Sequence, residues 1–323
     1  MGSLSPVEVE NVKGFLRLHS DGTVIRLEPT FDIPVHDDAS IHWKDVEFEP
    51  NFELSLRLYK PASSFSSTKL PVVIYFHAGG YCFGSRTWLQ SHNYCLRLAK
   101  ELQAVVLSPD HRLAPENRLP AAIEDGLTAL KWLRSCAVRE VAEKWVEDVD
   151  FERVFILGDS SGGNLAHHLA VRLGAGSPEM KPMRVGGYVL LSPFFGGTVR
   201  TRSEEMCPND AFYNMDVNDK FWRLSLPVGA NADHPLSNPF GLQSPNLESM
   251  ALDPLLVVAC GEDLLLDRVE EYAKKLKSWG KEVEFAKFEA KGHGFHTMDF
   301  FSKAADELMC LIKRFMAEST IRS

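Results

Sequence analysis

The sequence has no excess of basic residues and no long hydrophobic run, and both absences exclude classes of protein. Its 323 residues include 35 Lys and Arg against 44 Asp and Glu, a formal net charge of −9. A chain of this sign repels nucleic-acid phosphates and anionic lipid, so we expect neither as a partner. No stretch approaches the roughly 18 apolar residues that a membrane-spanning helix needs. Residues 1–11 do not resemble a secretory signal, so we expect a cytoplasmic protein, with the nucleus as the alternative.

The signatures of disulfide, metal and cofactor sites are also missing. The six cysteines are scattered without a Cys-x-x-Cys pair, which favours reduced thiols over a disulfide framework. His167 and His168 have no carboxylate at metal-ligand spacing. Gly196 and Gly197 follow an apolar run but open no G-x-G-x-x-G motif for a nucleotide. We therefore expect no bound metal and no cofactor.

The sequence does have short apolar runs that alternate with segments of helical periodicity. The runs cover residues 72–76, 104–107, 154–157, 188–191 and 255–259, and the helical segments cover 88–101, 121–134, 163–173, 268–279 and 303–316. Strands that are apolar throughout are buried on both faces, which indicates helices on both sides of a mostly parallel sheet. We predict that residues 1–323 form a single α/β domain.

Two stretches do not follow this alternation. Residues 1–45 precede it and contain a hairpin signal, Ser-Asp-Gly, between two strand-like runs. Residues 198–249 separate two of the apolar runs and are rich in Pro, Asn and aromatic residues. A long insertion after a strand lies on the side of an α/β sheet where ligands bind. We predict that both stretches form a lid over a site.

A nucleophile elbow is predicted at residues 158–162. The sequence Gly-Asp-Ser-Ser-Gly follows an apolar run and precedes a helical segment, which is the strand–turn–helix context of the G-x-S-x-G motif. Such a turn lifts its serine to the top of the sheet and directs the helix N-terminal amides at developing negative charge. Ser160 is therefore the candidate nucleophile.

A second loop is predicted to supply oxyanion-hole amides. His77-Ala78-Gly79-Gly80 follows the first apolar run and is similar to the HGGG-type loop of lipases and esterases. Ala78 takes the place of the first glycine and still supplies an N–H if its φ is negative. His77 is expected to hold the loop by hydrogen bonds, and the charged segment 110–116 to support it through buried ion pairs.

An acid and a histidine must follow the serine in chain order. Asp263 comes directly after the run 255–259, where a strand-end acid belongs, whereas Asp267 falls in the next helical segment and Glu262 is a weaker rival. His293 is flanked by two glycines, which would let a loop histidine reach the serine. His296 lacks these glycines and is predicted to begin the last helix.

Together these motifs resemble a known family. HAGG, DHRLAPE, GDSSGGN, the Asp263 loop and HGF, in this order, are similar to the hormone-sensitive-lipase group of α/β-hydrolases, and within it to the plant carboxylesterases, relatives of the gibberellin receptor. The likeness covers about residues 14–315. It implies the α/β-hydrolase fold, a triad and an oxyanion hole, with these members: Ser160, Asp263 and His293 for the triad, and the amides of Gly79, Gly80 and Ser161 for the hole.

The resemblance implies a serine carboxylesterase that hydrolyses an ester of a small lipophilic plant metabolite. Segments such as DKFWRLSLPVGA and NPFG further resemble the branch that hydrolyses strigolactones. A dehydratase or cyclase using the same pocket is the alternative, and a non-catalytic hormone receptor is less favoured because His293 is present. His111 stands where the family usually has tyrosine. Candidate pocket residues are Ala78, Phe221, Trp222 and Phe295.

Overall fold

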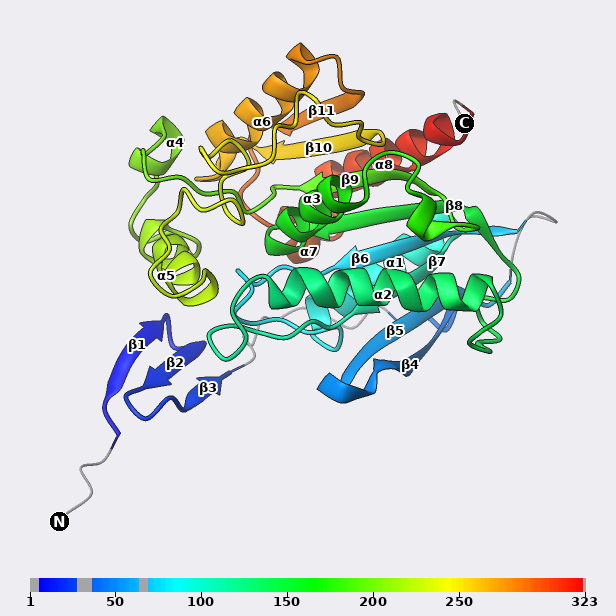
Figure 1. The fold of residues 1–323 in the computed structure, drawn as a ribbon, viewed down its shortest axis with the longest axis horizontal. Helices are drawn as coiled ribbons and strands as arrows, with labels where there is room; N and C mark the ends of the chain where they lie inside the picture. The colour runs from blue at the N-terminus through cyan, green and yellow to red at the C-terminus, as the bar shows by residue number, and fades with distance from the viewer. Residues whose placement is uncertain (1–5, 28–36, 64–68, 322–323) are drawn as a thin grey trace.

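The central feature of the computed structural model is an eight-stranded sheet, drawn in Figure 1. The structure describes residues 6–27, 37–63 and 69–321. The strands lie in the spatial order β11 (Val283–Phe288), β10 (Leu255–Cys260), β9 (Val185–Leu191), β8 (Val149–Asp159), β6 (Leu70–Phe76), β7 (Val105–Pro109), β5 (Leu54–Pro61) and β4 (Ile41–Glu49). The six strands from β11 to β7 are parallel, and β5 and β4 are antiparallel to their neighbours.

Helices cover both faces of this sheet, as the apolar runs predicted. The helices are α1 (Leu89–Leu102), α2 (Ala121–Ala137), α3 (Ser161–Leu173), α4 (Arg202–Glu205), α5 (Met215–Ser225), α6 (Leu266–Ser278), α7 (Phe295–Met298) and α8 (Lys303–Ile321), with 3-10 turns at Pro50–Phe52 and Pro178–Met180. Side chains of α2, α3 and α6 pack on one face in one apolar cluster, and those of α1 and α8 pack on the other. Among the described helices, none is both long and apolar enough to cross a bilayer.

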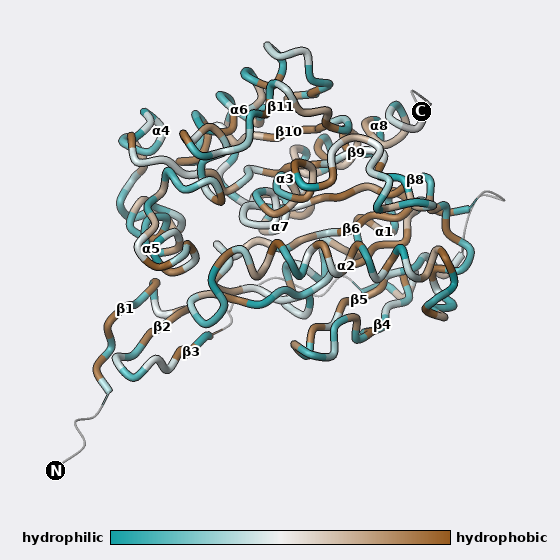
Figure 2. The backbone as a smooth tube through the Cα atoms, viewed as in Figure 1, coloured by the Kyte–Doolittle hydropathy of each residue, from teal (hydrophilic) through white to brown (hydrophobic). Residues whose placement is uncertain are grey.

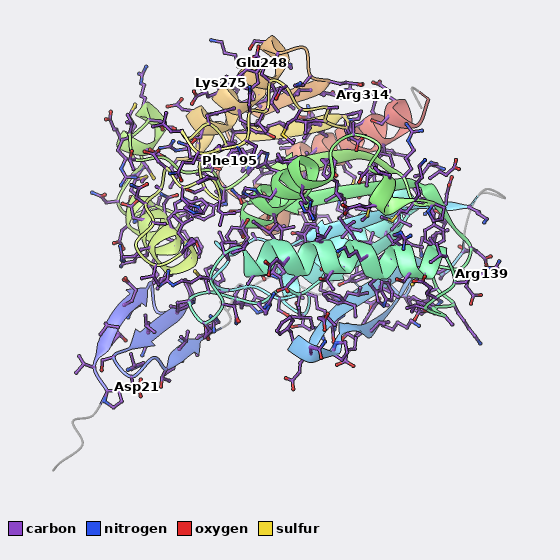
Figure 3. The ribbon with its side chains drawn as sticks, viewed as in Figure 1. Asp21, Arg139, Phe195, Glu248, Lys275 and Arg314 are labelled. Atoms are coloured by element: carbon purple, nitrogen blue, oxygen red, sulfur yellow. The ribbon has the colours of Figure 1, made fainter. Side chains whose placement is uncertain are left out.

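Strand β6 shows how the sequence builds this double-sided core. Its side chains alternate between the two clusters: Ile74 and Phe76 belong to the first, and Val73 and Tyr75 to the second. All four are at most 1% exposed, which is why the run contains no polar residue. The central strands are accordingly brown in the hydropathy colouring of Figure 2. In Figure 3, Phe195 lies inside the fold, whereas the charged Asp21 and Arg139 lie at its surface.

A separate three-stranded sheet is formed by β1 (Glu8–Val12), β2 (Leu16–His19) and β3 (Val24–Arg26). The hairpin predicted around Ser-Asp-Gly is confirmed as β2 and β3, which pair antiparallel. The segment predicted as residues 1–45 ends inside β4, so residues 41–45 belong to the edge of the central sheet instead. Part of that segment, residues 1–5 and 28–36, lies outside the described residues.

Candidate active site

Ser160 occupies a sharp turn between β8 and α3. Its φ of 55° and ψ of −113° place a non-glycine residue in a strained conformation, as a nucleophile elbow requires. Glycines on either side make the turn possible: a Cβ at Gly158 would overlap the carbonyl oxygen of Gly162, and one at Gly162 would overlap that of Phe76. The turn therefore presses the start of α3 against the end of β6, and only glycine fits at both contacts.

The Ser160 side chain opens into a cavity of about 370 Å³. The predicted residues Ala78, Gly79, Gly80 and His293 lie in the wall of the same cavity. Most of the remaining lining is apolar or aromatic and comes from the small sheet, the loop after β6, the start of α1 and the region around α5: Val12, Phe15, Phe83, Trp88, Phe212, Tyr213, Val217 and Phe221. Apolar surroundings of this kind strengthen the polar interactions made inside them.

Asp263 and His293 meet behind this cavity. Asp263 follows β10 and His293 follows β11, and these strands are parallel neighbours, so both residues leave the sheet at the same edge. His293 Nδ1 lies 2.6 Å from Asp263 Oδ2. A carboxylate only accepts hydrogen bonds, so Nδ1 donates and Nε2 remains the basic nitrogen. The backbone amide of Leu265 donates to the other oxygen, Oδ1, at 3.1 Å.

The surroundings of His293 have opposing effects on its pKa. Burial lowers the pKa of the imidazole, but the charge of Asp263 and the hydrogen bond to it act in the opposite direction. Asp159 adds a smaller effect of the same sign. The net result is a pKa above the ordinary value for histidine. A base of this kind accepts a proton more readily than an isolated imidazole does.

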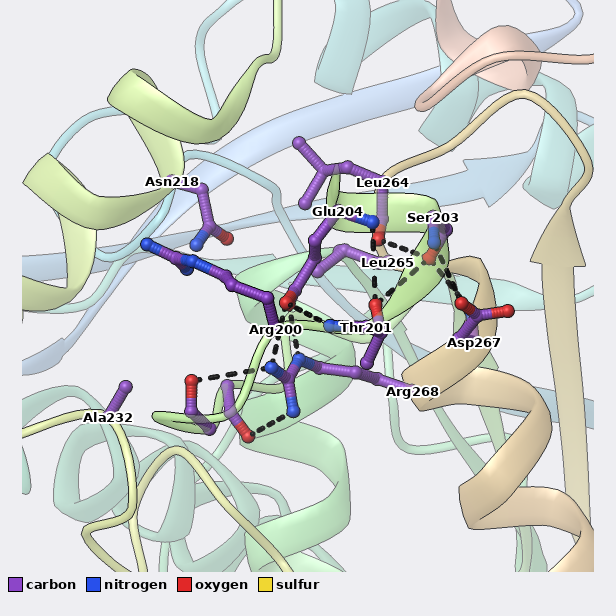
Figure 4. A network of polar contacts seen from close by, with 12 residues as sticks. Arg200, Thr201, Ser203, Glu204, Asn218, Ala232, Leu264, Leu265, Asp267 and Arg268 are labelled. Carbon is purple, nitrogen blue, oxygen red and sulfur yellow. Dashed lines mark hydrogen bonds and ion pairs between the residues drawn. The ribbon is translucent and has the colours of Figure 1, made fainter. Parts of the chain in front are cut away.

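The rival acids lie elsewhere. Asp267, in the first turn of α6, accepts a hydrogen bond from the Ser203 amide at 2.7 Å, and Glu262 is exposed. Figure 4 shows the network around Asp267, in which the Arg268 guanidinium pairs with the carboxylate of Glu204 and bonds to backbone carbonyls. The network fastens the start of the 198–249 stretch to the helix that follows Asp263, so Asp267 stabilises the fold around the site.

The segment of residues 77–84, called here the oxyanion loop after its predicted role, contains two glycines in backbone conformations that other residues rarely adopt. Gly79 and Gly80 have φ of 134° and 57°, and a Cβ at Gly80 would overlap the ring of Phe221. Ala78 does not have a positive φ, so alanine is unstrained there. In the part of the chain that the structure describes, no hydrogen bond uses the amide of Gly79, Gly80 or Ser161 as donor.

Two of the four predicted pocket residues lie outside the cavity lining. Ala78 and Phe221 line it, but Trp222 and Phe295 do not. Successive residues of a helix point about 100° apart, so Phe221 faces the cavity while Trp222 stacks on Phe194 with ring centroids 3.9 Å apart. Phe295 packs in the apolar cluster on the other face of the sheet. The pocket assignment of these two residues is therefore wrong.

Several other residues near the site were not identified by the sequence analysis. The ring of Tyr213 lies 4.5 Å, centroid to centroid, from that of His293. His296 belongs to the short α7 rather than to the last helix, and its Nε2 lies 3.3 Å from the buried Asp159 carboxylate. Burial raises the pKa of Asp159, but the neighbouring histidines outweigh it and hold that pKa low. No sequence motif signals these contacts, because they join residues that are distant along the chain.

The charged segment 110–116 forms ion pairs beside the site, as predicted. Arg112 pairs with the buried Asp125 at 2.7 Å, and Asp110 pairs with Arg86. All six cysteines are free thiols. Within residues 6–27, 37–63 and 69–321, no group of three or more His, Cys, Asp or Glu side chains could hold a metal ion.

Comparisons with known proteins agree with the observed fold. Residues 73–297 match a family described by its alpha/beta hydrolase fold. A probable carboxylesterase of Arabidopsis thaliana is 35% identical over 95% of this chain and 91% of its own. A 3-O-acetylpapaveroxine carboxylesterase of Papaver somniferum is 35% identical over 84% of this chain and 89% of its own, and a gibberellin receptor of Arabidopsis thaliana is 35% identical over 83% and 79%.

Solved structures show the same likeness. The thermostable carboxylesterase EstE1, cloned from a metagenomic library, has a TM-score of 0.73 and 28% identity over 88% of this chain and 90% of its own. An esterase of Pyrobaculum calidifontis has a TM-score of 0.72 and 27% identity over 89% of this chain and 87% of its own.

Proposed function

The chain belongs to the plant carboxylesterases of the α/β-hydrolase fold family, and we propose that it hydrolyses its ester through Ser160, His293 and Asp263. The observation that carries the proposal is the shared cavity wall of Ser160 and His293, with Asp263 hydrogen-bonded behind the imidazole at 2.6 Å. The order of the three residues along the chain is also that of an α/β-hydrolase triad.

In the proposed reaction, Ser160 Oγ attacks the carbonyl carbon of the ester while His293 Nε2 takes the hydroxyl proton. The tetrahedral oxyanion is held by the amides of Gly79, Gly80 and Ser161. His293 then gives its proton to the departing alkoxide, which leaves an acyl group on Ser160. Water, deprotonated by the same nitrogen, attacks this acyl-enzyme; the bond to Ser160 Oγ then breaks, His293 returns the proton to that oxygen, and the carboxylic acid leaves. Losing one oxyanion donor costs such sites about 3 kcal/mol.

Asp263 has two parts in this scheme. Its hydrogen bond fixes the tautomer of His293 that leaves Nε2 free to accept a proton. Its negative charge also stabilises the imidazolium that forms in the transition state, which agrees with the raised pKa of His293. The carboxylate side chain is only 1% exposed, so water screens this charge weakly.

The cavity supports a small, lipophilic ester as the substrate. Its volume of about 370 Å³ is near the lower end of the range for drug-sized ligand sites, and its lining is mainly aromatic and apolar. Lys13 is the one Lys or Arg among the described lining residues, and it bonds to the Ala211 carbonyl. A plant hormone of the strigolactone type, a compact apolar lactone, is the specific candidate that we propose within this class.

We also propose that the small sheet and the 198–249 stretch together act as the lid. Phe15 of the first and Phe212 of the second both line the cavity, and their ring centroids lie 5.6 Å apart. Lys220 of α5 donates to the Asn11 carbonyl at 2.9 Å, which adds a polar contact between the two parts. An apolar cover of this kind excludes water from the acyl-enzyme until the leaving group has departed.

The test compares Ser160→Ala with Ser108→Ala, a matched change at another buried serine that follows no catalytic motif. We expect Ser160→Ala to lower kcat on a small aryl acetate by up to about 10⁶-fold and to abolish labelling by a fluorophosphonate. Ser108→Ala should retain both. Hydrolysis by Ser160→Ala close to the wild-type rate would show that the proposed mechanism is wrong. A synthetic strigolactone in the same assay tests the specific substrate separately.

A further inference from the structure

Two buried imidazole rings, those of His77 at the start of the oxyanion loop and of His111, stack on each other. Their centroids are 4.6 Å apart and their planes differ by 17°. The sheet brings them together: Ile74 of β6 lies opposite Leu107 of β7, and each histidine follows one of these parallel strands. The two residues are only 1% and 4% exposed. Neither is a member of the proposed triad, so the buried pair needs another explanation.

The hydrogen bonds of the pair fix the tautomer of each ring. His77 Nδ1 lies 2.8 Å from the carbonyl oxygen of Ala78, and His111 Nδ1 lies 3.1 Å from that of Arg112. A carbonyl oxygen only accepts, so each Nδ1 must carry a hydrogen. Burial lowers the pKa of both rings, to about 3 for His111, where the neighbouring His77 acts in the same direction. Burial therefore favours the neutral form of both rings.

The first of these hydrogen bonds controls an amide of the proposed oxyanion hole. The carbonyl of Ala78 and the N–H of Gly79 belong to one planar peptide group and point in opposite directions. When His77 Nδ1 donates to that carbonyl, the plane of the peptide is fixed. The Gly79 N–H is then directed away from His77, and Gly79 lines the cavity.

The Ala78 carbonyl and the His77 ring are also closely packed against Gly84. A Cβ at Gly84 would lie 2.5 Å from the Ala78 oxygen and 2.5 Å from His77 Nδ1. The backbone of Gly84 thus packs against the Ala78 carbonyl and the edge of the His77 ring. The ring of His111 packs against one face of the His77 ring. Without the second ring, the His77 side chain would have room to rotate about its Cβ–Cγ bond and break the hydrogen bond.

We propose that His111 is a positioning residue: its ring holds His77 in the orientation that donates to Ala78, and so aims the Gly79 amide at the oxyanion. This inference rests on the proposed function of that amide. The role needs a flat ring at position 111 and does not need its nitrogens. An aromatic substitution should therefore preserve the function, and an aliphatic one of similar volume should not.

The experiment compares His111→Leu, which keeps most of the volume, with His111→Phe, which keeps a flat ring. Each variant is assayed for kcat and KM on a small aryl acetate and for inhibition by an aryl trifluoromethyl ketone, whose adduct with Ser160 carries an oxyanion. We expect His111→Leu to lower kcat and the affinity for the ketone by the same factor, about 10-fold or more, with KM within about 2-fold of wild type. His111→Phe should restore both. His111→Ala serves as a second ring-free variant if the leucine variant does not fold.

The control is His92→Ala, which removes another buried histidine. His92 is 7% exposed and bonds to the Tyr59 hydroxyl, so its loss should lower the unfolding temperature and leave the affinity for the ketone unchanged. A His111→Leu enzyme that is less stable but has wild-type kcat and ketone affinity would overturn the proposal. If wild type neither hydrolyses the acetate nor binds the ketone, the proposed function itself fails, and the two failures are thereby distinguished.

Discussion

The carboxylate of Asp263 accepts a hydrogen bond from His293 Nδ1 at 2.6 Å, although the two residues are 30 positions apart in the chain. The contact exists because β10 and β11 are parallel neighbours, with Cys260 opposite Phe288 at their carboxyl ends. Loops that leave adjacent parallel strands at the same edge necessarily begin side by side. Asp267 lies a helical turn further on, and its carboxylate instead accepts a hydrogen bond from the Ser203 amide.

The first prediction follows from this contact. Asp263→Asn should lower kcat by about 10⁴-fold, the effect that loss of the correct histidine tautomer has in serine proteases. Asp267→Asn, the matched change, should stay within a few-fold of wild type and mainly affect stability. Steady-state kinetics on an aryl acetate, with unfolding curves for each variant, would measure both effects. A fully active Asp263→Asn with an inactive Asp267→Asn would reverse the assignment.

A second prediction concerns pH. The proposed base must be neutral to act, so kcat/KM should fall as the pH drops through the His293 pKa, which lies above the ordinary value of about 6.5. Asp263→Asn removes the negative charge that raises this pKa, whereas burial remains and lowers it. The acid limb should therefore move to lower pH in that variant. The profile is best measured at constant ionic strength, with NMR titration of His293 where residual activity is too low. Identical limbs in both proteins would contradict the assignment.

A third prediction tests the elbow glycines. Gly162→Ala places a Cβ where it overlaps the carbonyl oxygen of Phe76, so α3 must move away from β6. We expect a loss of about 3 kcal/mol or more in the free energy of unfolding, together with most of the esterase activity. Gly176→Ala is the control: its φ of 64° also disfavours alanine, but no atom lies within 4 Å of the added carbon. That variant should lose only about 1–2 kcal/mol and keep its activity.

A fourth prediction concerns the buried ion pair of Figure 4. The side chains of Arg268 and Glu204 are 10% and 1% exposed, so removing one partner leaves a charge with little access to water. Arg268→Ala should lower the free energy of unfolding by about 3–5 kcal/mol. Arg314→Ala breaks a pair with Glu284 that is much more exposed and should lose at most about 1 kcal/mol. Urea unfolding of both variants gives the comparison, and equal losses would show that burial of the pair is unimportant.

The fifth prediction tests the lid. Deleting residues 1–20 removes Val12, Lys13 and Phe15 from the cavity wall. Each large apolar contact is worth about 1.5–3 kcal/mol, so KM for bulky lipophilic esters should rise about 10-fold or more. Small acetates bury less surface and should be affected less. Phe15→Ala should show a milder version of the same selectivity. Equal losses on small and bulky esters would indicate that the segment is structural and not a lid.

Much of the fold could be predicted because its signals are local. The apolar run at 72–76 and the Gly-Asp-Ser-Ser-Gly turn need only neighbouring residues to be recognised. Strands β1 and β4 were missed because they are short or exposed edge strands with polar residues on their open faces, such as Glu8 and Asp45. An edge strand buries too little to leave a strong apolar pattern in its sequence.

The pocket was less predictable than the triad, because its wall is assembled from distant segments. Phe15 and Phe212 are neighbours only in the folded chain. Trp222 was assigned to the pocket on composition alone, and its place opposite Phe194 depends on the rotation of α5 about its axis. Hydrophobic periodicity predicts neither the Phe15–Phe212 contact nor the orientation of Trp222. It shows which residues share a face of a helix, but not which face lines the cavity.

Arg26 gives the small sheet an influence on the oxyanion loop. From β3, its guanidinium donates to the carbonyl of Cys82 within that loop at 2.7 Å and to the carbonyl of Ala114 at 2.7 Å, while it pairs with Glu116. Any displacement of β3 that admits a substrate must strain or release the bond to Cys82. Thermodynamic linkage is reciprocal, so a ligand that stabilises the loop must also favour the docked position of β3, by the same coupling free energy. Substrate entry and transition-state binding would then both depend on the equilibrium between the docked and the displaced position of β3.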